Sequence, residues 1–231
     1  MILNKQEARK IINLNPKGLI DVDIAERQFE VILKGFNHLN QSKNNFLYIA
    51  DEVGLGKTYV ALGIASLLRH FSSNKEHHKD CIIVPKKNLQ SKWRKEIRNF
   101  ISNNYLLECN IVKTPLGTSV GLCEDVNIHP RLEYVGRENP SYEIFRNSSF
   151  SISASSDDWK EKLVDQLPES VAYIFKAAIK RFKTIEEDVL LRRLYAYLLN
   201  ITMPDFDLLI VDEAHNFKHG TQGEVSYRNQ V

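Results

Sequence analysis

The chain has 231 residues, of which 43% are hydrophobic and 26% are charged, an ordinary composition for a globular protein with a buried core. Its 31 basic and 29 acidic residues nearly balance, which excludes a polycation that binds nucleic acid by overall charge. No apolar run approaches the roughly 20 residues of a membrane-spanning helix, and the first residues lack a secretory-signal pattern. We therefore expect no membrane partner and a cytoplasmic location, nucleoid-associated in a bacterium or nuclear in a eukaryote.

The first half of the chain alternates predicted helices and strands. Apolar residues at helical spacing predict a helix over 24–40, and a second one over 58–71. Short apolar runs at 46–50 and 81–85 predict buried strands, the second closed by a proline. A further helix follows that proline, because one side of it carries four large apolar residues: Leu89, Trp93, Ile97 and Phe100.

The second half of the chain is less regular. Residues 111–158 show little periodicity apart from a predicted strand at 150–155. Two helices are expected at 159–183 and 185–200, and a buried strand at 207–212. Three short buried strands separated by helices predict an α/β fold with a parallel sheet and helices on both faces. Ligands of such sheets bind at the carboxyl ends of the strands.

Charge is distributed unevenly. Residues 75–98 contain eight basic and three acidic residues, whereas residues 111–231 contain 14 basic and 18 acidic ones. The basic segment is either a solvated helix face or a surface that contacts phosphates.

The cysteines do not suggest a covalent or metal framework. Cys81, Cys109 and Cys123 are odd in number and widely spaced, unlike a set of disulfides. A zinc site built from Cys109, Cys123 and His129 is conceivable, but no Cys-x-x-Cys pair supports it. We interpret the three cysteines as ordinary thiols.

Residues 50–58, ADEVGLGKT, follow a predicted strand and open a predicted helix, as a phosphate-binding loop does. Gly54 and Gly56, on either side of Leu55, let backbone N–H groups turn toward an anion at the helix N-terminus. Lys57 can reach the outer phosphates of a nucleotide, and the Thr58 hydroxyl can ligate Mg²⁺. The general pattern begins with glycine, where this chain has aspartate at position 51.

A second set of polar residues follows the last predicted strand, in LLIVDEAH at 208–215. Asp212 is placed to hold Mg²⁺, usually through water, and Glu213 to polarise an attacking water as general base. The alternative is a surface Asp–Glu pair that caps a helix. That alternative explains poorly why both acids follow an uninterrupted hydrophobic strand.

Together, ADEVGLGKT, CIIVPKKNLQSKWRKEI at 81–97 and DLLIVDEAHNFKH at 207–219 resemble motifs I, Ia and II of superfamily-2 helicases. More narrowly, Asp51, the proline followed by Trp93, and Asn-Phe-Lys after DEAH resemble the Swi/Snf-type branch of duplex DNA translocases. The resemblance implies an incomplete RecA-like P-loop lobe with a partly helical insertion. We expect an N-terminal extension at 1–23 and the first part of the lobe at 24–110. The insertion is expected at 111–204 and the continued lobe, with the DEAH motif, at 205–231.

The resemblance also implies ATP and Mg²⁺ as cofactors and a role for each matching residue. Gln28 would read adenine, Lys57 would contact the transferring phosphate, Glu213 would activate water, and His215 would couple the nucleotide to the nucleic-acid track. The residues that would bind the nucleotide or its metal are five loop residues and one acid: Gly54, Leu55, Gly56, Lys57, Thr58 and Asp212. Of these, Thr58 and Asp212 would hold the Mg²⁺. The residues facing a nucleic-acid backbone, without base specificity, would be Pro85, Lys86 and Lys87. Trp93 fits the core better than a stacking role.

The implied activity is ATP-driven translocation on DNA, with duplex DNA favoured, in bacterial DNA processing or anti-phage defence. The second RecA-like lobe is absent from these 231 residues, so we expect the chain alone to be almost inactive, because that lobe supplies arginines to the transition state. Residues 111–204 could bind a protein partner. Strand separation, RNA as the track, a P-loop NTPase that remodels a protein partner, and a binding module without hydrolysis remain alternatives.

Overall fold

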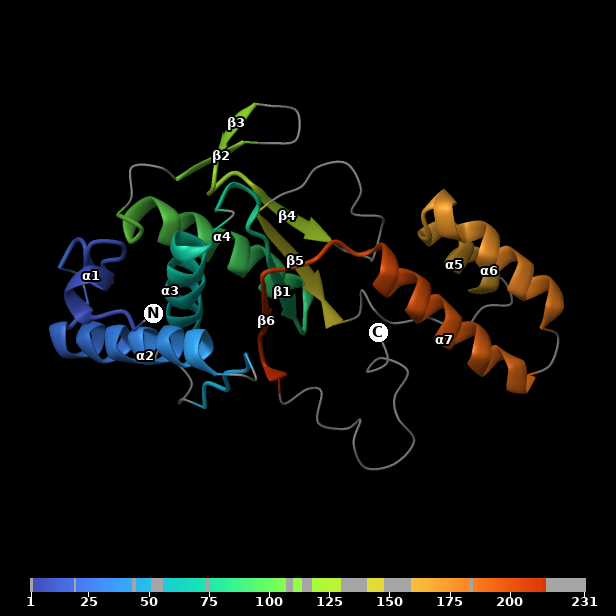
Figure 1. Ribbon diagram of the computed structural model, residues 1–231, viewed down its shortest axis with the longest axis horizontal. Coiled ribbons are helices and arrows are strands. Elements are labelled where there is room, and N and C mark those ends of the chain that lie inside the picture. The colour runs from blue at the N-terminus through green and yellow to red at the C-terminus, as the bar shows by residue number, and fades with distance from the viewer. Residues whose placement is uncertain are drawn as a thin grey trace. The chain divides into compact units, whose positions relative to one another are not determined.

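The computed structural model describes residues 2–18, 20–42, 45–50, 56–73, 75–106, 110–113, 118–129, 141–147, 159–182 and 185–214. The predicted strand at 150–155 lies outside these residues. The elements in chain order are α1 (Lys5–Arg9), α2 (Val22–Gln41), α3 (Lys57–Phe71), η1 (Lys75–His77), β1 (Asp80–Val84), α4 (Lys87–Asn103), β2 (Ile111–Lys113), β3 (Ser119–Gly121), β4 (Val126–His129), β5 (Tyr142–Arg146), α5 (Trp159–Gln166), α6 (Glu169–Arg181), α7 (Ile185–Thr202) and β6 (Leu208–Val211) (Figure 1).

Four strands form one sheet in the order β4-β5-β1-β6. At the start of β1, the Asp80 N–H donates to the Ser141 carbonyl just before β5 (2.9 Å). At the other end of β1, the N–H of Asp212, directly after β6, donates to the Ile83 carbonyl (2.9 Å). Starts bond to starts and ends to ends, which is the pattern of parallel strands. The predicted α/β fold with a parallel sheet is confirmed.

A second, two-stranded sheet pairs β2 with β3 in antiparallel register, with Ile111 opposite Gly121 (Figure 1). Neither β2 and β3 nor β4 and β5 were expected from the sequence. These strands lack the uninterrupted apolar runs that indicated β1 and β6.

Residue contacts divide the chain into two compact units. Unit 1 comprises Met1–Asp80, Ser91–Asn127 and Pro140–Glu143, and unit 2 comprises Cys81–Gln90, Ile128–Asn139 and Ile144–Val231. None of the described helices is long and apolar enough to span a membrane.

In unit 1, α2 and α3 approach closely because two glycines leave room for side chains of the facing helix. A Cβ added at Gly35 would lie 2.7 Å from Cδ1 of Ile64, and one added at Gly63 would collide with Ile32. The predicted helices over 24–40 and 58–71 are thus confirmed and packed against each other.

The C-terminal end of α3 is tied to the sheet by a buried ion cluster. Arg69 donates to the Asp80 carboxylate (3.0 Å) and to the carbonyls of His78 (2.8 Å) and Ser141 (3.1 Å). Nε2 of His78 lies 3.0 Å from the same carboxylate, and the guanidinium lies over the ring of Tyr142. Because Arg69 and Asp80 are 3% and 0% exposed, losing either one would leave an uncompensated buried charge.

The run at 46–50 is not a strand, so that prediction is wrong. Phe46 and Tyr48 are 69% and 62% exposed, and no strand is assigned there. The Leu47 side chain lies against α2, since a Cβ at Gly35 would be 2.9 Å from its Cδ2. The segment therefore packs one side against a helix instead of joining the sheet.

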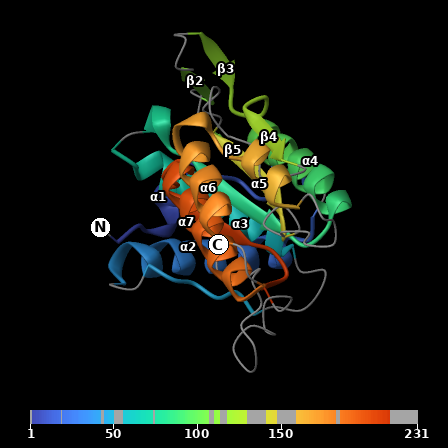
Figure 2. The same cartoon turned by 90° about the vertical axis from the view of Figure 1, so that its right-hand side faces the viewer.

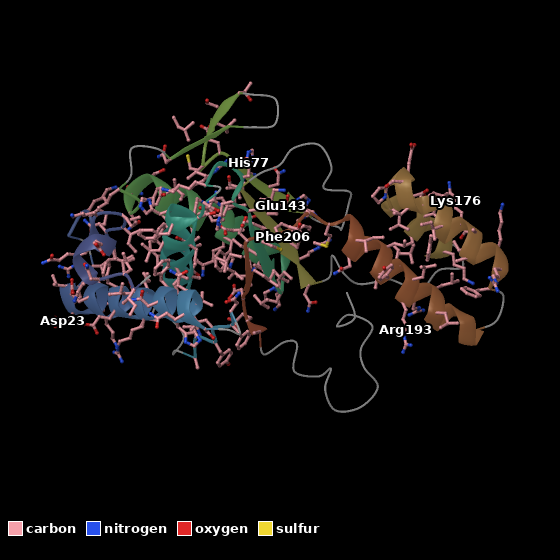
Figure 3. The ribbon with its side chains drawn as sticks, viewed as in Figure 1. Asp23, His77, Glu143, Lys176, Arg193 and Phe206 are labelled. Atoms are coloured by element: carbon pink, nitrogen blue, oxygen red, sulfur yellow. The ribbon has the colours of Figure 1, made fainter. Side chains whose placement is uncertain are left out.

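In unit 2, α5, α6 and α7 pack on one apolar core, and Figure 2 shows these three helices grouped together. The helix predicted over 159–183 is broken at Leu167, because Pro168 has no N–H to continue α5 and instead precedes α6. Lys176 and Arg193 are exposed and lie on the outside of α6 and α7 (Figure 3). The core joins these helices to β1 and β5 through ten residues: Cys81, Phe145, Leu163, Leu167, Val171, Ala172, Phe175, Leu191, Tyr195 and Leu198.

Candidate functional site

The N-terminus of α3 begins directly at the predicted phosphate loop. Gly56 has a φ of 77° and a ψ of 30°, a left-handed conformation that glycine adopts without strain. Its carbonyl accepts hydrogen bonds from the N–H groups of Tyr59 (2.8 Å) and Val60 (3.1 Å). The earlier N–H groups of the first turn point toward the helix end, where an anion is favoured. Lys57 and Thr58 stand half-buried in that turn.

Gln28, from α2, lies against this turn. A Cβ added at Gly56 would collide with the Gln28 side-chain amide. Although 27 positions separate the two residues in the sequence, the packing of α2 on α3 brings them into contact. The structure thus places the predicted adenine-reading residue beside the predicted phosphate loop, within unit 1.

The first turn of α3 also contacts α4. The Tyr59 ring packs edge-on against Phe100, with the centroids 5.5 Å apart. Burial, and secondarily the nearby Glu96 carboxylate, raises the pKa of the Tyr59 hydroxyl. The sequence alone gave no sign that Tyr59 fixes the position of the turn.

The predicted acids lie at the carboxyl end of β6, in unit 2. The Asp212 N–H bonds to Ile83 of β1, so the backbone at this acid is anchored to the end of the neighbouring strand. Glu213 follows with a φ of 53°, in the left-handed region that side chains other than glycine seldom adopt. This unusual backbone marks the turn as a place where geometry is imposed by the surrounding structure.

The segment after β1 reaches the same edge of the sheet. Pro85 is half-buried, whereas Lys86 and Lys87 are exposed at the start of α4. Because Ile83 bonds to Asp212, this segment begins next to the acidic turn in unit 2.

Gln90 holds the beginning of α4 at this edge, a role that the sequence did not predict. Its side chain is 1% exposed, and its Nε2 donates to the carbonyls of His129 on β4 (2.8 Å) and Ile144 on β5 (3.0 Å). His129 also stacks on Phe145, with ring centroids 4.6 Å apart. His129 is thus engaged in strand-end packing.

The predicted site residues form two sets. Gln28, Gly56, Lys57 and Thr58 belong to unit 1, and Pro85, Lys86, Lys87, Asp212 and Glu213 belong to unit 2. Gly54, Leu55 and His215 lie outside the described residues. In the first set Gln28 contacts Gly56, and in the second the backbone of Asp212 is bonded to the end of β1.

Each unit contains one predicted oxygen donor for Mg²⁺, Thr58 in unit 1 and Asp212 in unit 2. Among the described residues, no three His, Cys, Asp or Glu side chains gather in a way that could hold a metal ion. Cys109, part of the weighed zinc set, lies outside them. A hydroxyl such as that of Thr58 and a single carboxylate such as that of Asp212 suit Mg²⁺, which usually keeps several waters and binds phosphate oxygens.

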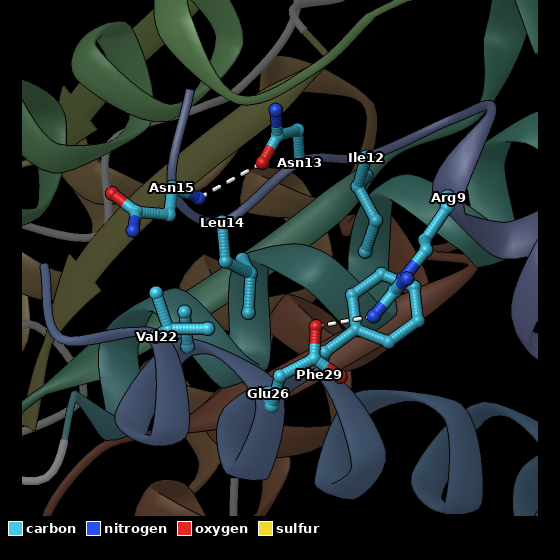
Figure 4. Close-up of a pocket in the computed structure, with 9 residues that line it drawn as sticks. Arg9, Ile12, Asn13, Leu14, Asn15, Val22, Glu26 and Phe29 are labelled. Carbon is cyan, nitrogen blue, oxygen red and sulfur yellow. Dashed lines mark hydrogen bonds and ion pairs between the residues drawn. The ribbon is translucent and has the colours of Figure 1, made fainter. Parts of the chain in front are cut away.

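A hollow in unit 1 is lined by Glu26 and Phe29, on either side of Gln28 in the sequence, but not by Gln28 itself. It has a volume of about 370 Å³ and lies between the N-terminal residues and α2 (Figure 4). No predicted site residue lines it.

Comparison with known proteins adds one finding. The model of the family described as type III restriction enzyme, res subunit, matches residues 21–230, which include both sets of site residues. No curated protein and no solved structure matches the chain.

Proposed function

The chain belongs to the family of the type III restriction enzyme res subunit, and we propose that it is the ATP-binding lobe of a motor that translocates on duplex DNA. The family is one of helicase superfamily 2, so the chain contains a helicase-like, ATP-hydrolysing domain with a RecA-like α/β fold. The Swi/Snf branch, the duplex track and the role of each residue belong to the proposal.

The contact between Gln28 and Gly56 carries the proposal. A glutamine amide can both donate to and accept from the edge of adenine, and here it lies beside a helix N-terminus suited to phosphates. Both ends of an adenine nucleotide therefore find chemically matching groups within unit 1. Lys57 and Thr58 would bind the outer phosphates and their Mg²⁺.

The acidic turn supports the hydrolytic step. Asp212 would hold Mg²⁺ through water, and the metal would neutralise charge on the transferring phosphate. Glu213 would orient the attacking water and accept its proton. A carboxylate on a left-handed turn is held by its backbone, which restricts where the base can point.

Exposed cations support a nucleic-acid track. In unit 2, Lys86 and Lys87 are exposed directly after β1, and in unit 1, α4 exposes Lys92, Lys95 and Arg98. Such side chains neutralise phosphates without reading bases, as expected of a motor that moves along any sequence. The family description names a restriction enzyme, which favours DNA as the track and defence against foreign DNA as the setting.

Polynucleotide stimulation tests the proposal. ATP hydrolysis by a protein that joins this lobe to a second RecA-like lobe would be measured without polynucleotide and with duplex DNA, single-stranded DNA or RNA. We expect the largest stimulation with duplex DNA, weakened by salt because the contacts are ionic. Preferential stimulation by RNA or single strands would overturn the duplex assignment. Hydrolysis indifferent to every polynucleotide would favour an ATPase that remodels a protein partner.

A further inference from the structure

Residues 2–15, the N-terminal strap, lie outside the part of the chain that matches the family, yet they are built into unit 1. The strap is anchored by apolar side chains that are at most 4% exposed: Leu3, Ala8, Ile11, Ile12 and Leu14. Burial of this extent indicates a fixed part of the fold, since a loosely attached terminus would leave such side chains in water.

One end of the strap is fastened next to α4. The Asn13 N–H donates to the Asn104 carbonyl, and the Asn104 side-chain amide donates back to the Asn13 carbonyl, both at 2.8 Å. The Leu106 N–H donates to the carbonyl of Ile11 (2.9 Å). These bonds hold the strap directly after the C-terminal end of α4.

The other end is fastened to α2. Leu3 and the Asn37 side chain exchange two hydrogen bonds, of 2.8 and 2.9 Å. Nearer the start of α2, Lys5 and Arg9 both form ion pairs with Glu26. The Arg9 guanidinium also lies over the ring of Phe29, 5.5 Å from its centroid.

Between these attachments, the strap does not pack tightly on α2. The hollow of about 370 Å³ separates them, with Leu14, Val22 and Phe29 among its walls and the ion pair of Arg9 with Glu26 at its side (Figure 4). Ala25 and Phe29 of α2 are nevertheless buried, and the exposed ion pairs of Lys5 and Arg9 with Glu26 add to this apolar contact.

Gln28 lies within that same part of α2. Further along the helix, Ile32 and Gly35 face Gly63 and Ile64 of α3. In the helical turn from Glu26 to Phe29, Glu26 and Phe29 therefore contact the strap, and Gln28 contacts Gly56.

We propose that the N-terminal strap positions Gln28 for base recognition, and that Arg9 and Lys5 are positioning residues that set the preference for adenine over other nucleotide bases. This inference rests on the proposed function, in which Gln28 reads adenine. If the strap releases Glu26, the first turns of α2 move relative to α3, and the Gln28 amide loses its alignment. We expect the phosphate contacts of α3 to change less, because the ion pairs of Lys5 and Arg9 are made to Glu26 of α2.

The test compares the affinities of the chain for MgATP and MgGTP, which differ only in the base. We expect Arg9→Ala to lower the ATP-over-GTP preference about two- to fivefold, the range for one exposed ion pair, and Arg9→Lys to restore part of it. The double variant Lys5→Ala/Arg9→Ala should lower it about tenfold. All of these positions are on the surface, so the variants should fold.

The matched control is Lys10→Ala/Lys17→Ala, which removes the same charge. Both lysines are exposed, and neither has an ion pair with a described residue. This control should keep the wild-type preference, whereas Gln28→Ala should abolish it.

The outcomes separate the two ideas. If Gln28→Ala loses the preference but the strap variants keep it, the strap inference is overturned and the proposed function stands. If wild type binds ATP and GTP equally, or Gln28→Ala keeps a clear preference, adenine reading by Gln28 fails and the strap inference fails with it. Equal weakening of both affinities in the strap variants, with the ratio unchanged, also overturns the inference, because it indicates general loosening.

Discussion

The two sets of site residues are held in different ways. Gln28 and Gly56 meet because two helices pack closely around Gly35 and Gly63, so their contact depends on side-chain volume. Asp212 and Glu213 follow β6, where Leu209 is 57% exposed, and they are held by a backbone hydrogen bond and a left-handed turn. The contact between Gln28 and Gly56 in unit 1 therefore depends on core packing, whereas the positions of Asp212 and Glu213 in unit 2 depend on backbone geometry.

The largest expected effect separates the sets by function. Glu213→Gln keeps the size of the side chain but removes the base. In a protein that joins this lobe to a second RecA-like lobe, we therefore expect hydrolysis to fall by about 10²–10⁴ while nucleotide affinity stays unchanged. Lys57→Ala should instead weaken nucleotide binding. Parallel measurement of turnover and nucleotide affinity checks both variants. If Glu213→Gln turns over ATP normally, Glu213 is not the base.

Packing around Gly63 provides the next test. Gly63→Val places two methyl groups against Ile32, so we expect a loss of about 1–3 kcal/mol in the free energy of unfolding, with weaker nucleotide binding. Urea unfolding measures the first, and titration with nucleotide the second. Ala177→Val, at an exposed position of α6, controls for the helix propensity of valine. Equal stability of the two variants would show that the α2–α3 contact is loose.

The sequence predicted the helices and strands that have a regular apolar pattern and missed those that lack one. Helices α2, α3 and α4 were predicted because their buried residues recur at helical spacing, and β1 and β6 because they are short apolar runs. Strand β5 was missed, since it buries Glu143 completely and so lacks an apolar pattern. The run at 46–50 was misassigned, because an apolar run does not reveal whether a helix or a sheet covers it.

Of the candidate site, the sequence and its family resemblance identified the residue types, and the structure supplied their neighbours. Gln28 was singled out as a lone glutamine, and its contact with Gly56 depends on a helix crossing that no local pattern encodes. The parts played by Gln90 and Arg9 could not be predicted, because both act through contacts distant in sequence. The left-handed backbone of Glu213 likewise has no sequence signature, since glutamate is not a residue that favours it.

A matched pair of variants sharpens the claim that backbone geometry holds the acidic turn. Glu213→Gly and Glu213→Ala both remove the carboxylate, but only glycine adopts a φ of 53° without steric cost. We expect the glycine variant to be more stable than the alanine variant by about 1 kcal/mol, the typical cost of a left-handed residue. Thermal or urea unfolding measures the difference. An alanine variant of equal or greater stability would mean that the turn relaxes freely.

The smallest expected effect concerns acid pH and the ion pairs that join the strap to α2, the helix that carries Gln28. The hydrogen bond from Lys5, with the charge of Arg9 as a smaller contribution, lowers the pKa of Glu26 below its usual value of 4.5. Since the folded state favours the ionised carboxylate, its stabilisation is complete above pH 4.5 and is lost as the pH falls through the lowered pKa. Wild type should therefore be more stable than Glu26→Gln by a few tenths of a kcal/mol near pH 7, because the pair is exposed, and this gap should close in acid. A gap that is independent of pH would mean that Glu26 acts through its shape and hydrogen bonds, without its charge.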